Sequence, residues 1–290
     1  MANKRAGILI NPISGGKSKA PVIELIKTNF PKEYEFEFIM WEKAEQREDI
    51  IKKIQARNYD VVVAAGGDGT INLVATSVKG TNSAMAIIPL GSGNGLARHL
   101  HIPLDTQKAV ELIGTGKSLL IDACNVNGIN FFCTSGVGFD AEIGKAFAES
   151  KKRGFASYIQ LIIKKLLSYK TQQYSLIIDG KQVDVSAFLI TLANASQYGN
   201  DAYIAAHANC SDGLIDVVVL KPFNFFTTFI IAQKILNKTL HLSRFVDVYK
   251  GKEIKVIRKN EGAVHFDGEP EEMGTELNYT IQPSVVKVIV

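Results

Sequence analysis

The chain has 290 residues, of which 46% are hydrophobic and 21% are charged. These values are near the averages of soluble globular proteins and exclude a disordered, collagen-like or coiled-coil chain. The formal net charge is only +4, which is too small to predict a dedicated nucleic-acid-binding surface. At about 100–200 residues per domain, the length predicts two domains, with one large domain as the alternative.

The sequence predicts a cytoplasmic protein without a transmembrane segment. No apolar stretch approaches the roughly 20 residues that a membrane-spanning helix needs. The N-terminus runs directly into the strand-like Gly7–Ile10, without the apolar region of a secretory signal. Cys124, Cys133 and Cys210 are odd in number and lack metal-type spacing, so reduced and buried thiols are expected.

Short apolar runs alternate with helix-like segments up to about residue 120. The expected order is a strand over 7–10, a helix over 19–29, a strand over 36–40, a helix over 42–57, a strand over 61–65, a helix after Thr70, a strand over 85–89, and helices over 94–100 and 106–113. Continuous apolar runs separated by helices indicate a parallel sheet that is covered on both faces. Residues 1–120 are therefore predicted to form a doubly wound α/β domain.

The pattern then changes to strands joined by turns, which predicts a mainly antiparallel β domain over residues 121–278. Asn127-Gly128 and Asp179-Gly180 are typical of tight hairpin turns, and Lys250-Gly251-Lys252 also separates two strand-like runs. Two helices are expected in this half, over 155–167 and 223–236. We find no internal repeat and no low-complexity linker.

Three glycine-rich turns each follow an apolar strand of the first half. They are Asn11-Pro12-Ile13-Ser14-Gly15-Gly16, Gly66-Gly67-Asp68-Gly69-Thr70 and Gly91-Ser92-Gly93-Asn94-Gly95. Such turns converge beyond the carboxyl ends of parallel strands, where glycines and helix N-termini bind phosphate groups. A nucleotide is therefore the expected ligand, although any one of these turns is equally explained by tight-turn geometry alone.

Asp68 is the most informative of these residues, because a carboxylate near phosphate is repelled unless it binds Mg²⁺ or takes a proton. The alternative is an aspartate that only forms the turn. Other nucleotide motifs fail: Asn11 stands where a Walker-type loop that ends in Gly16-Lys17-Ser18 requires glycine, and no segment fits the dinucleotide pattern G-x-G-x-x-G.

The second half contains two further acidic turns. Phe266-Asp267-Gly268-Glu269-Pro270 places two carboxylates around a glycine, and by itself it is more typical of a hairpin turn. The second acidic turn is Asn209-Cys210-Ser211-Asp212-Gly213-Leu214. Its oxygen donors suit Mg²⁺ or Ca²⁺, and the alternative is a polar loop that binds no cation. Asp122 and Asp140 lie in apolar surroundings and need partners, so both are candidate site residues.

The order of these motifs resembles the diacylglycerol kinase catalytic-domain family, which includes soluble bacterial lipid kinases and sphingosine kinases. The resemblance spans nearly the whole chain. It implies an α/β nucleotide domain like that of NAD kinases and phosphofructokinases, followed by a β-sandwich domain for the lipid substrate. It also implies that the last strand, about residues 279–290, returns to the first domain.

The resemblance further implies transfer of the γ-phosphate of ATP to a lipid hydroxyl, with Mg²⁺. Asp68 would handle Mg²⁺ and the reacting phosphate, and Glu269 would accept the proton of the lipid hydroxyl. The residues implied at the nucleotide are Asn11, Pro12, Ser14, Gly15, Trp41, Gly66, Gly67, Asp68, Gly69, Thr70, Asn72 and Ser92. Asn209, Asp212 and the carbonyl of Leu214 would bind a structural Mg²⁺.

Two positions depart from the family pattern. Gly95 stands where bacterial diacylglycerol kinases carry aspartate, and Met40-Trp41-Glu42 stands where a threonine usually contacts the nucleotide. The acceptor therefore stays open between diacylglycerol and a sphingoid base. A kinase of a soluble substrate such as NAD, or a non-catalytic nucleotide- or lipid-binding protein, is the alternative.

We expect the protein to act at the membrane surface on its lipid substrate. The segment from Lys151 to Leu167 joins basic and apolar residues, as an interfacial helix requires. Packing of its apolar face on the β domain is the alternative, and the segment 223–236 is the next candidate. The oligomeric state is open, with a homodimer among the options.

Overall fold

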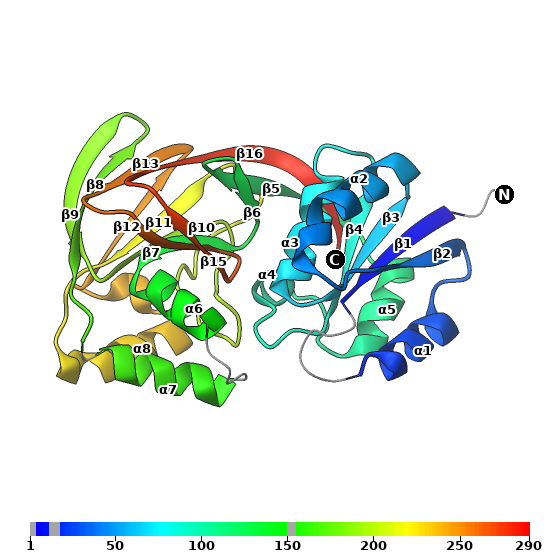
Figure 1. The fold of residues 1–290 in the computed structure, drawn as a ribbon, viewed down its shortest axis with the longest axis horizontal. Coiled ribbons are helices and arrows are strands. Elements are labelled where there is room, and N and C mark those ends of the chain that lie inside the picture. The colour runs from blue at the N-terminus through cyan, green and yellow to red at the C-terminus, as the bar shows by residue number, and fades with distance from the viewer. Residues whose placement is uncertain (1–3, 12–17, 150–154, 167) are drawn as a thin grey trace. The chain divides into compact units, whose positions relative to one another are not determined.

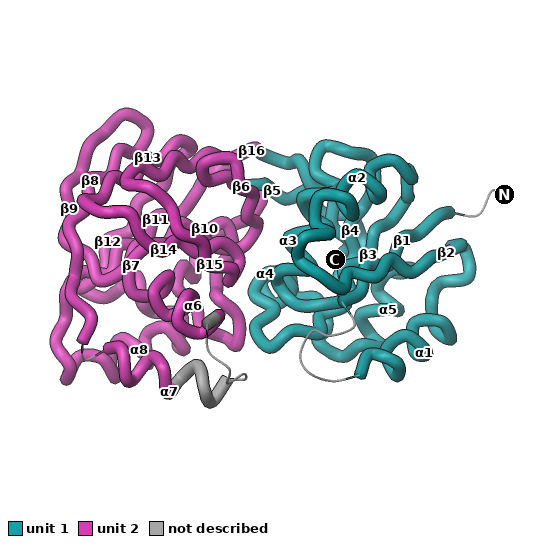
Figure 2. The backbone as a smooth tube through the Cα atoms, in the orientation of Figure 1, with its two compact units in different colours: residues 1–123, 283–290 teal, residues 124–282 magenta. Residues whose placement is uncertain are grey.

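The computed structural model describes residues 4–11, 18–149, 155–166 and 168–290. The chain forms two compact units (Figure 2). Unit 1 contains residues 1–123 and 283–290, and unit 2 contains residues 124–282. Among the described residues, no helix combines the length and the apolar character needed to cross a membrane.

Unit 1 contains a parallel sheet in the order β2-β1-β3-β4-β16 (Figure 1). Its strands are β1 (Lys4–Ile10), β2 (Tyr34–Met40), β3 (Val61–Gly66), β4 (Ala84–Pro89) and the end of β16 (Glu276–Ile289), with β5 (Ser118–Val126) beside β16. Every residue of β3 and β4 is buried. Strands buried on both faces are typical of a doubly wound sheet, so the predicted fold class of this half is confirmed.

Helices cover both faces of this sheet (Figure 1). They are α1 (Ala20–Asn29), η2 (Ala44–Gln46), α2 (Arg47–Arg57), α3 (Asp68–Val78), α4 (Gly95–His99) and α5 (Thr106–Thr115). Ile26 of α1 and Val110 of α5 pack with Ile8 and Val63 in one core, whereas α2 and α3 contact each other on the other face.

Unit 2 is a sandwich of two antiparallel sheets. One has the order β12-β11-β10-β7-β14-β15, and the other contains β16-β13-β8-β9. The strands are β6 (Ile129–Phe131), β7 (Thr134–Gly138), β8 (Gln172–Ile178), β9 (Lys181–Ala187), β10 (Leu189–Ala193), β11 (Ile215–Leu220), β12 (Val246–Gly251), β13 (Glu253–Arg258), β14 (Gly262–Phe266) and β15 (Glu269–Met273). Ile190 and Val217 of the first sheet pack against Leu176 and Val256 of the second. The predicted β-sandwich is therefore confirmed.

Helices cover the outer face of the six-stranded sheet of unit 2. They are α6 (Phe139–Glu149), α7 (Phe155–Leu166), η3 (Phe225–Thr227), α8 (Thr228–Leu236) and η4 (Leu240–Leu242). Leu189 and Val218 point to this face and share a core with Phe139 and Ile231. Because Ile190 and Val217 point into the sandwich, β10 and β11 are buried on both faces.

Two features of this half go beyond the sequence predictions. The turn at Lys250-Gly251-Lys252 separates two strands as predicted, but it carries the chain from one sheet to the other, because β12 pairs with β11 whereas β13 pairs with β8 and β16. Gly251 is required for close approach there, since a Cβ on it would lie 2.7 Å from Ile178 Cγ2. The helix α6 was not among the helices predicted for this half.

β16 contributes to both units. Its first half pairs with β13, where Tyr279 opposes Ile254 and packs in the sandwich core. Its last residues pair with β4 of unit 1 through Lys287 and Val288. The C-terminal segment that belongs to unit 1 begins at Pro283.

Candidate active site

Four chain segments leave the sheet of unit 1 at its carboxyl edge. Ile10 pairs with both Met40 and Ala65, and Gly66 pairs with Pro89. The residues after these strands therefore emerge side by side, which is where open α/β sheets bind ligands. Of the first glycine-rich turn, Asn11 is described, whereas Pro12, Ser14 and Gly15 lie outside the described residues.

Asp68 joins the second glycine-rich turn to the third. Its two carboxylate oxygens accept hydrogen bonds from the backbone N–H groups of Asn94 at 3.0 Å and Gly95 at 2.8 Å. Asp68 is also the first residue of α3, where the helix dipole favours a negative charge. The side chain therefore holds two turns together while it lies at the N-terminus of a helix.

The same two turns approach each other through glycines. A Cβ on Gly91 would lie 2.6 Å from the Cα of Gly67, a distance that real Cβ atoms do not tolerate. The third turn is closed by Asn94, whose side chain accepts from the N–H of Gly91 at 3.0 Å and donates to its carbonyl at 2.9 Å. Asn94 has a φ of 55°, which asparagine tolerates better than most residues.

We expect Gly91→Ala to push these two turns apart, because its Cβ meets backbone at Gly67 rather than a flexible side chain. Overpacking of this kind costs about 1–3 kcal/mol of unfolding free energy. Urea unfolding and nucleotide affinity of the purified variant measure both consequences. Gly274→Ala is the matched control, since a Cβ there meets nothing within 4 Å. Equal stability and affinity of the two variants would contradict the close approach.

Thr70 and Asn72 are buried on α3 behind the second turn. The side chain of Thr70 lies directly against Gly66, where no Cβ fits. Asn72 accepts a hydrogen bond at 2.6 Å from the guanidinium of Arg47 on α2. These two predicted nucleotide residues therefore have clear packing roles in this structure.

Trp41 and Ser92 are the more accessible of the predicted nucleotide residues. Trp41 is half-buried, and its indole N–H donates to the carbonyl of Lys43 at 2.8 Å. Ser92 is exposed at the tip of the third turn. Gly69 follows Asp68 in the first turn of α3. The structure thus brings Asn11, Trp41, Gly66 to Thr70 and Ser92 to the same edge of the sheet.

His99 ends α4, directly after the third turn, and burial lowers its pKa to about 4, with a smaller contribution from His101. Between pH 6.5 and pH 4, His99 is therefore protonated in the unfolded chain but neutral in the folded chain. Its contribution to the free energy of unfolding is fully present above about pH 6.5 and is lost as the pH falls toward 4. We expect unit 1 to lose about 1–2 kcal/mol of unfolding free energy between pH 7 and pH 5 through His99.

Urea unfolding of wild type and His99→Gln at both pH values measures this loss. The variant should lose less stability on acidification, because glutamine does not titrate. The hydrogen bond from Tyr59 is the first cause that lowers the pKa of Glu37. Any stability that the protein loses by protonation of this carboxylate is therefore lost below pH 5. An identical loss in wild type and variant would show that His99 is not the titrating group.

In unit 2, Glu269 is exposed at the start of β15. It follows a tight turn in which Asp267 and Gly268 have φ values of 49° and 87°. The buried carboxylate of Asp267 accepts hydrogen bonds from the backbone N–H groups of Phe132, Cys133 and Thr134, at 2.8–3.2 Å. Asp267 therefore fixes the turn that presents Glu269.

Asp140 is the centre of a polar cluster that sequence reasoning did not assemble. Its Oδ2 lies 3.1 Å from His265 Nε2 and accepts a hydrogen bond from the Tyr198 hydroxyl at 2.8 Å. Thr191 also contacts both Asp140 and Tyr198. These residues come from α6, β14, β10 and the loop after β10, so only the folded sheet brings them together. The cluster gives Asp140 the partners that its apolar surroundings require.

Asp122 is a fully buried residue of β5 in unit 1. Its carboxylate accepts a hydrogen bond from the backbone N–H of Ser284 at 2.7 Å. Ser284 has a φ of 55°. The side chain therefore satisfies the backbone where β16 bends.

The predicted cation-binding residues lie in the loop before β11. Asn209 accepts from the N–H of Ser211, and Asp212 accepts from the N–H of Leu214. The ammonium group of Lys250 lies 3.3 Å from Asp212 Oδ2 and 3.1 Å from Asp216 Oδ2. A Mg²⁺ ion at these residues would have to compete with that ammonium group, so this donor set fits a divalent cation poorly.

Burial raises the pKa of Asp216, against the opposing effect of Lys250. The partner ammonium thus compensates a carboxylate that is costly to bury. Among the described residues there is no cluster of three or more His, Cys, Asp or Glu side chains arranged for a metal ion.

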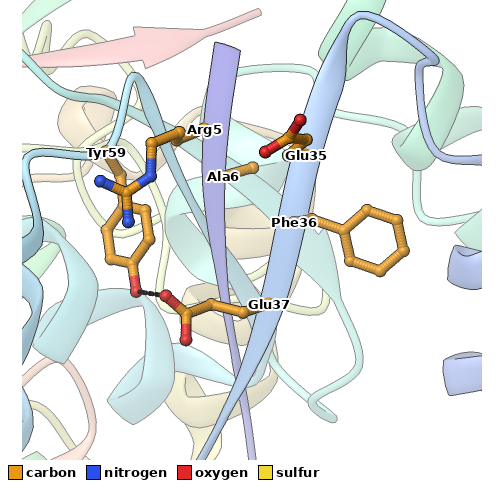
Figure 3. Close-up of a pocket in the computed structure, with 6 residues that line it drawn as sticks. All are labelled: Arg5, Ala6, Glu35, Phe36, Glu37 and Tyr59. Carbon is orange, nitrogen blue, oxygen red and sulfur yellow. Dashed lines mark hydrogen bonds between the residues drawn. The ribbon is translucent and has the colours of Figure 1, made fainter. Parts of the chain in front are cut away.

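A separate hollow in unit 1 is lined by Arg5, Ala6, Glu35, Phe36, Glu37 and Tyr59 (Figure 3). The Tyr59 hydroxyl donates to Glu37 at 2.7 Å, and burial raises the pKa of Tyr59 to about 12, so this donor stays protonated. Arg5 and Ala6 lie at the amino end of β1, and Tyr59 precedes β3. This is the edge of the sheet opposite to the glycine-rich turns, where ligands are not expected.

Comparison with known families covers nearly the whole chain. Residues 5–126 match the diacylglycerol kinase catalytic domain family, and residues 134–290 match the YegS C-terminal NAD kinase beta sandwich-like domain family. The chain therefore belongs to the diacylglycerol kinase catalytic-domain family, a family of lipid kinases. The resemblance inferred from the glycine-rich and acidic motifs is confirmed.

Similarity to individual proteins extends over most of the chain. A protein named diacylglycerol kinase from Bacillus subtilis strain 168 is 28% identical over 274 residues, which are 92% of this chain and 90% of the relative. The uncharacterized protein sll0036 from Synechocystis is 29% identical over 74% of this chain, and the chain spans only 53% of its length. A crystal structure described as a diacylglycerol kinase from Bacillus anthracis strain Sterne superposes with a TM-score of 0.73 at 18% identity, covering 99% of this chain and 96% of the other.

Proposed function

We propose that this protein is an ATP-dependent lipid kinase that transfers a γ-phosphate to a lipid hydroxyl, such as that of diacylglycerol or a sphingoid base. The observation that carries the proposal is the arrangement at the carboxyl edge of the sheet in unit 1. Two glycine-rich turns are held together there by Asp68, with the N-terminus of α3 beside them. Backbone N–H groups and glycines at such an edge suit phosphate groups.

The chemistry of Asp68 fits a hard cation. Both of its carboxylate oxygens accept backbone hydrogen bonds where the two glycine-rich turns meet, so the negative charge lies at the edge of the sheet where phosphate groups are expected. Carboxylate oxygens are the protein ligands that Mg²⁺ prefers when it is carried by nucleotide phosphates. When bound, Mg²⁺ would neutralise the phosphate charge that develops during transfer.

Glu269 is the proposed proton acceptor. Its carboxylate is exposed, and the turn before it is fixed by three hydrogen bonds to Asp267, so the side chain is presented on a rigid element. The general base would take the proton of the lipid hydroxyl as its oxygen attacks phosphorus. The nucleotide would be bound by the turns that contain Asn11, Gly67 and Ser92, with Trp41 beside them.

The test is a radiolabelled γ-phosphate transfer assay against a panel of membrane lipids in micelles, with NAD as the soluble comparison. Label in a chloroform-soluble product supports the proposal. Label in NAD alone would favour the alternative of a soluble substrate, because the second family match is to an NAD kinase-like sandwich. Nucleotide binding without transfer to any acceptor would favour a non-catalytic protein.

We further propose a cytoplasmic location with peripheral binding to the membrane, because the acceptor of a lipid kinase lies in a bilayer. The structural Mg²⁺ at Asn209, Asp212 and Leu214 stays a prediction. The ammonium group of Lys250 beside Asp212 disfavours a cation there, and no step of the proposed mechanism uses this ion.

A further inference from the structure

Exposed apolar side chains gather on η3 and α8 of unit 2. Phe226 is 87% exposed and Phe229 is 69% exposed. Phe225, Ile230 and Leu236 are also exposed, and we call these five side chains the α8 surface. Contiguous exposed apolar residues on a soluble unit usually mark an interaction site.

The helix itself explains why this surface lacks a partner within unit 2. Ile231 is buried in the core beneath α8, and Ile235 packs against that core. Phe229 and Leu236 are seven residues apart and so share another face of the helix. An ordinary surface helix is apolar on one face only, whereas α8 is apolar on a second face that is exposed.

The charge around this surface has one sign. Between residues 221 and 246 the sequence has four cationic side chains, Lys221, Lys234, Lys238 and Arg244, and no Asp or Glu. Lys221 pairs with Asp247, whereas no ion pair among the described residues involves the other three; Lys238 lies over the ring of Tyr203 and Arg244 over that of Phe245. Apolar aromatic side chains beside cations that have no carboxylate partner are typical of segments that lie in the interface of an anionic bilayer.

The neighbouring helix α7 does not offer a comparable surface in its described part. Leu161, Ile162 and Leu166 pack against the same core as α8, so much of its apolar face is covered within unit 2. Its Lys164 and Lys165 add positive charge without adding an acidic residue. The basic residues Lys151 to Arg153, which the sequence analysis named as candidates for membrane contact, lie outside the described residues.

We propose that the α8 surface docks this protein on an anionic lipid bilayer, with Phe226 and Phe229 entering the interface and Lys234, Lys238 and Arg244 facing lipid phosphates. The inference deepens the proposed function, because it rests on an acceptor that lies in a membrane. A second copy of the chain fits less well. Symmetric pairing through this surface would bring the cations of both copies together, with no acidic residue in the segment to oppose them.

The first test measures binding without ATP or turnover. Vesicles of phosphatidylcholine, with and without phosphatidylglycerol, are sedimented with wild type and with the double variant Phe226→Ser/Phe229→Ser. We expect wild type to prefer the anionic vesicles and the variant to bind them at least about tenfold more weakly. Leu104→Ser/Leu120→Ser is the matched control, since both leucines are exposed apolar residues of unit 1. Equal binding by all three proteins would overturn the proposal.

A second measurement reports insertion directly. The three native cysteines are buried, so an environment-sensitive thiol dye attaches selectively to a Phe226→Cys variant. Its emission should shift to the blue on anionic vesicles, whereas the same dye on Leu104→Cys should not respond. No shift at residue 226 would overturn the proposal even if the protein sediments with vesicles.

Kinase assays separate this inference from the proposed function. The double serine variant should phosphorylate a micelle-dispersed acceptor like wild type but lose activity on vesicles. If wild type binds vesicles through Phe226 but has no lipid kinase activity, the proposed function is refuted and the proposal that the α8 surface binds membranes stands. A third outcome is that wild type is dimeric by light scattering, whereas the double serine variant is monomeric and binds vesicles as well as wild type. This result would assign the α8 surface to self-association and refute the inference.

Discussion

Asp68→Asn is expected to reduce phosphate transfer by about 100-fold or more, because it removes the carboxylate charge proposed to position Mg²⁺ and the reacting phosphate. The structure adds a second consequence. Asparagine offers one acceptor oxygen where Asp68 uses two, so the N–H of Asn94 or Gly95 loses its partner. An unsatisfied N–H of this kind costs about 1–3 kcal/mol. Turnover, Mg²⁺ dependence and urea unfolding of the purified variant measure the separate effects.

Two further variants distinguish charge from turn geometry. Asn94→Gly keeps the left-handed backbone but removes the two hydrogen bonds that close the third turn, so it loosens the turn with the charge of Asp68 in place. Asp49→Asn removes an acidic side chain from the first turn of α2 and controls for the loss of one charge near a helix N-terminus. If Asn94→Gly is as inactive as Asp68→Asn, the role of Asp68 is structural. Normal turnover by Asp68→Asn would exclude it from the mechanism altogether.

The sequence predicted the first unit well because its signals are local. Every residue of β3 is apolar or glycine, and a continuous apolar run followed by a glycine-rich turn indicates a buried parallel strand whichever strand lies beside it. The hydrogen bonds from Asn94 and Gly95 to Asp68 could not be predicted in the same way. They depend on the register between β3 and β4, in which Gly66 opposes Pro89.

In the second unit, the pairing of strands could not be predicted where the turn between them permits two outcomes. Asp179-Gly180 does close a hairpin, between β8 and β9, whereas Lys250-Gly251-Lys252 carries the chain from one sheet to the other. Both segments contain turn residues between strand-like runs, and only the pairing partners of β12 and β13 separate the two cases. The ion pairs of Lys250 with Asp212 and Asp216 depend on the same pairing, because Asp216 of β11 opposes Lys250 of β12. Oxygen donors in a loop therefore predicted a cation without revealing that a lysine competes for it.

Glu269→Gln should lower the turnover number by roughly 100- to 10,000-fold, which is the usual contribution of a general base, while it leaves ATP affinity nearly unchanged. The side chain is exposed, and the turn before it is held by Asp267, so the amide should occupy the same place without disturbing the sandwich. Turnover is measured with a saturating lipid acceptor, and ATP affinity is measured by titration calorimetry. A separation of the two parameters identifies a group that acts on the acceptor rather than on the nucleotide.

Glu271→Gln supplies the matched control for this prediction, because it makes the same change at another exposed position of β15. Glu272 is less suitable, since its carboxylate pairs with Lys145 at 2.6 Å. The control should turn over like wild type, which would show that loss of one negative charge from this strand is not the cause. If ATP affinity falls as steeply as turnover in Glu269→Gln, the residue is a nucleotide or metal ligand. The base would then be sought at Asp68 or at Asp140, whose carboxylate lies beside His265 and Tyr198.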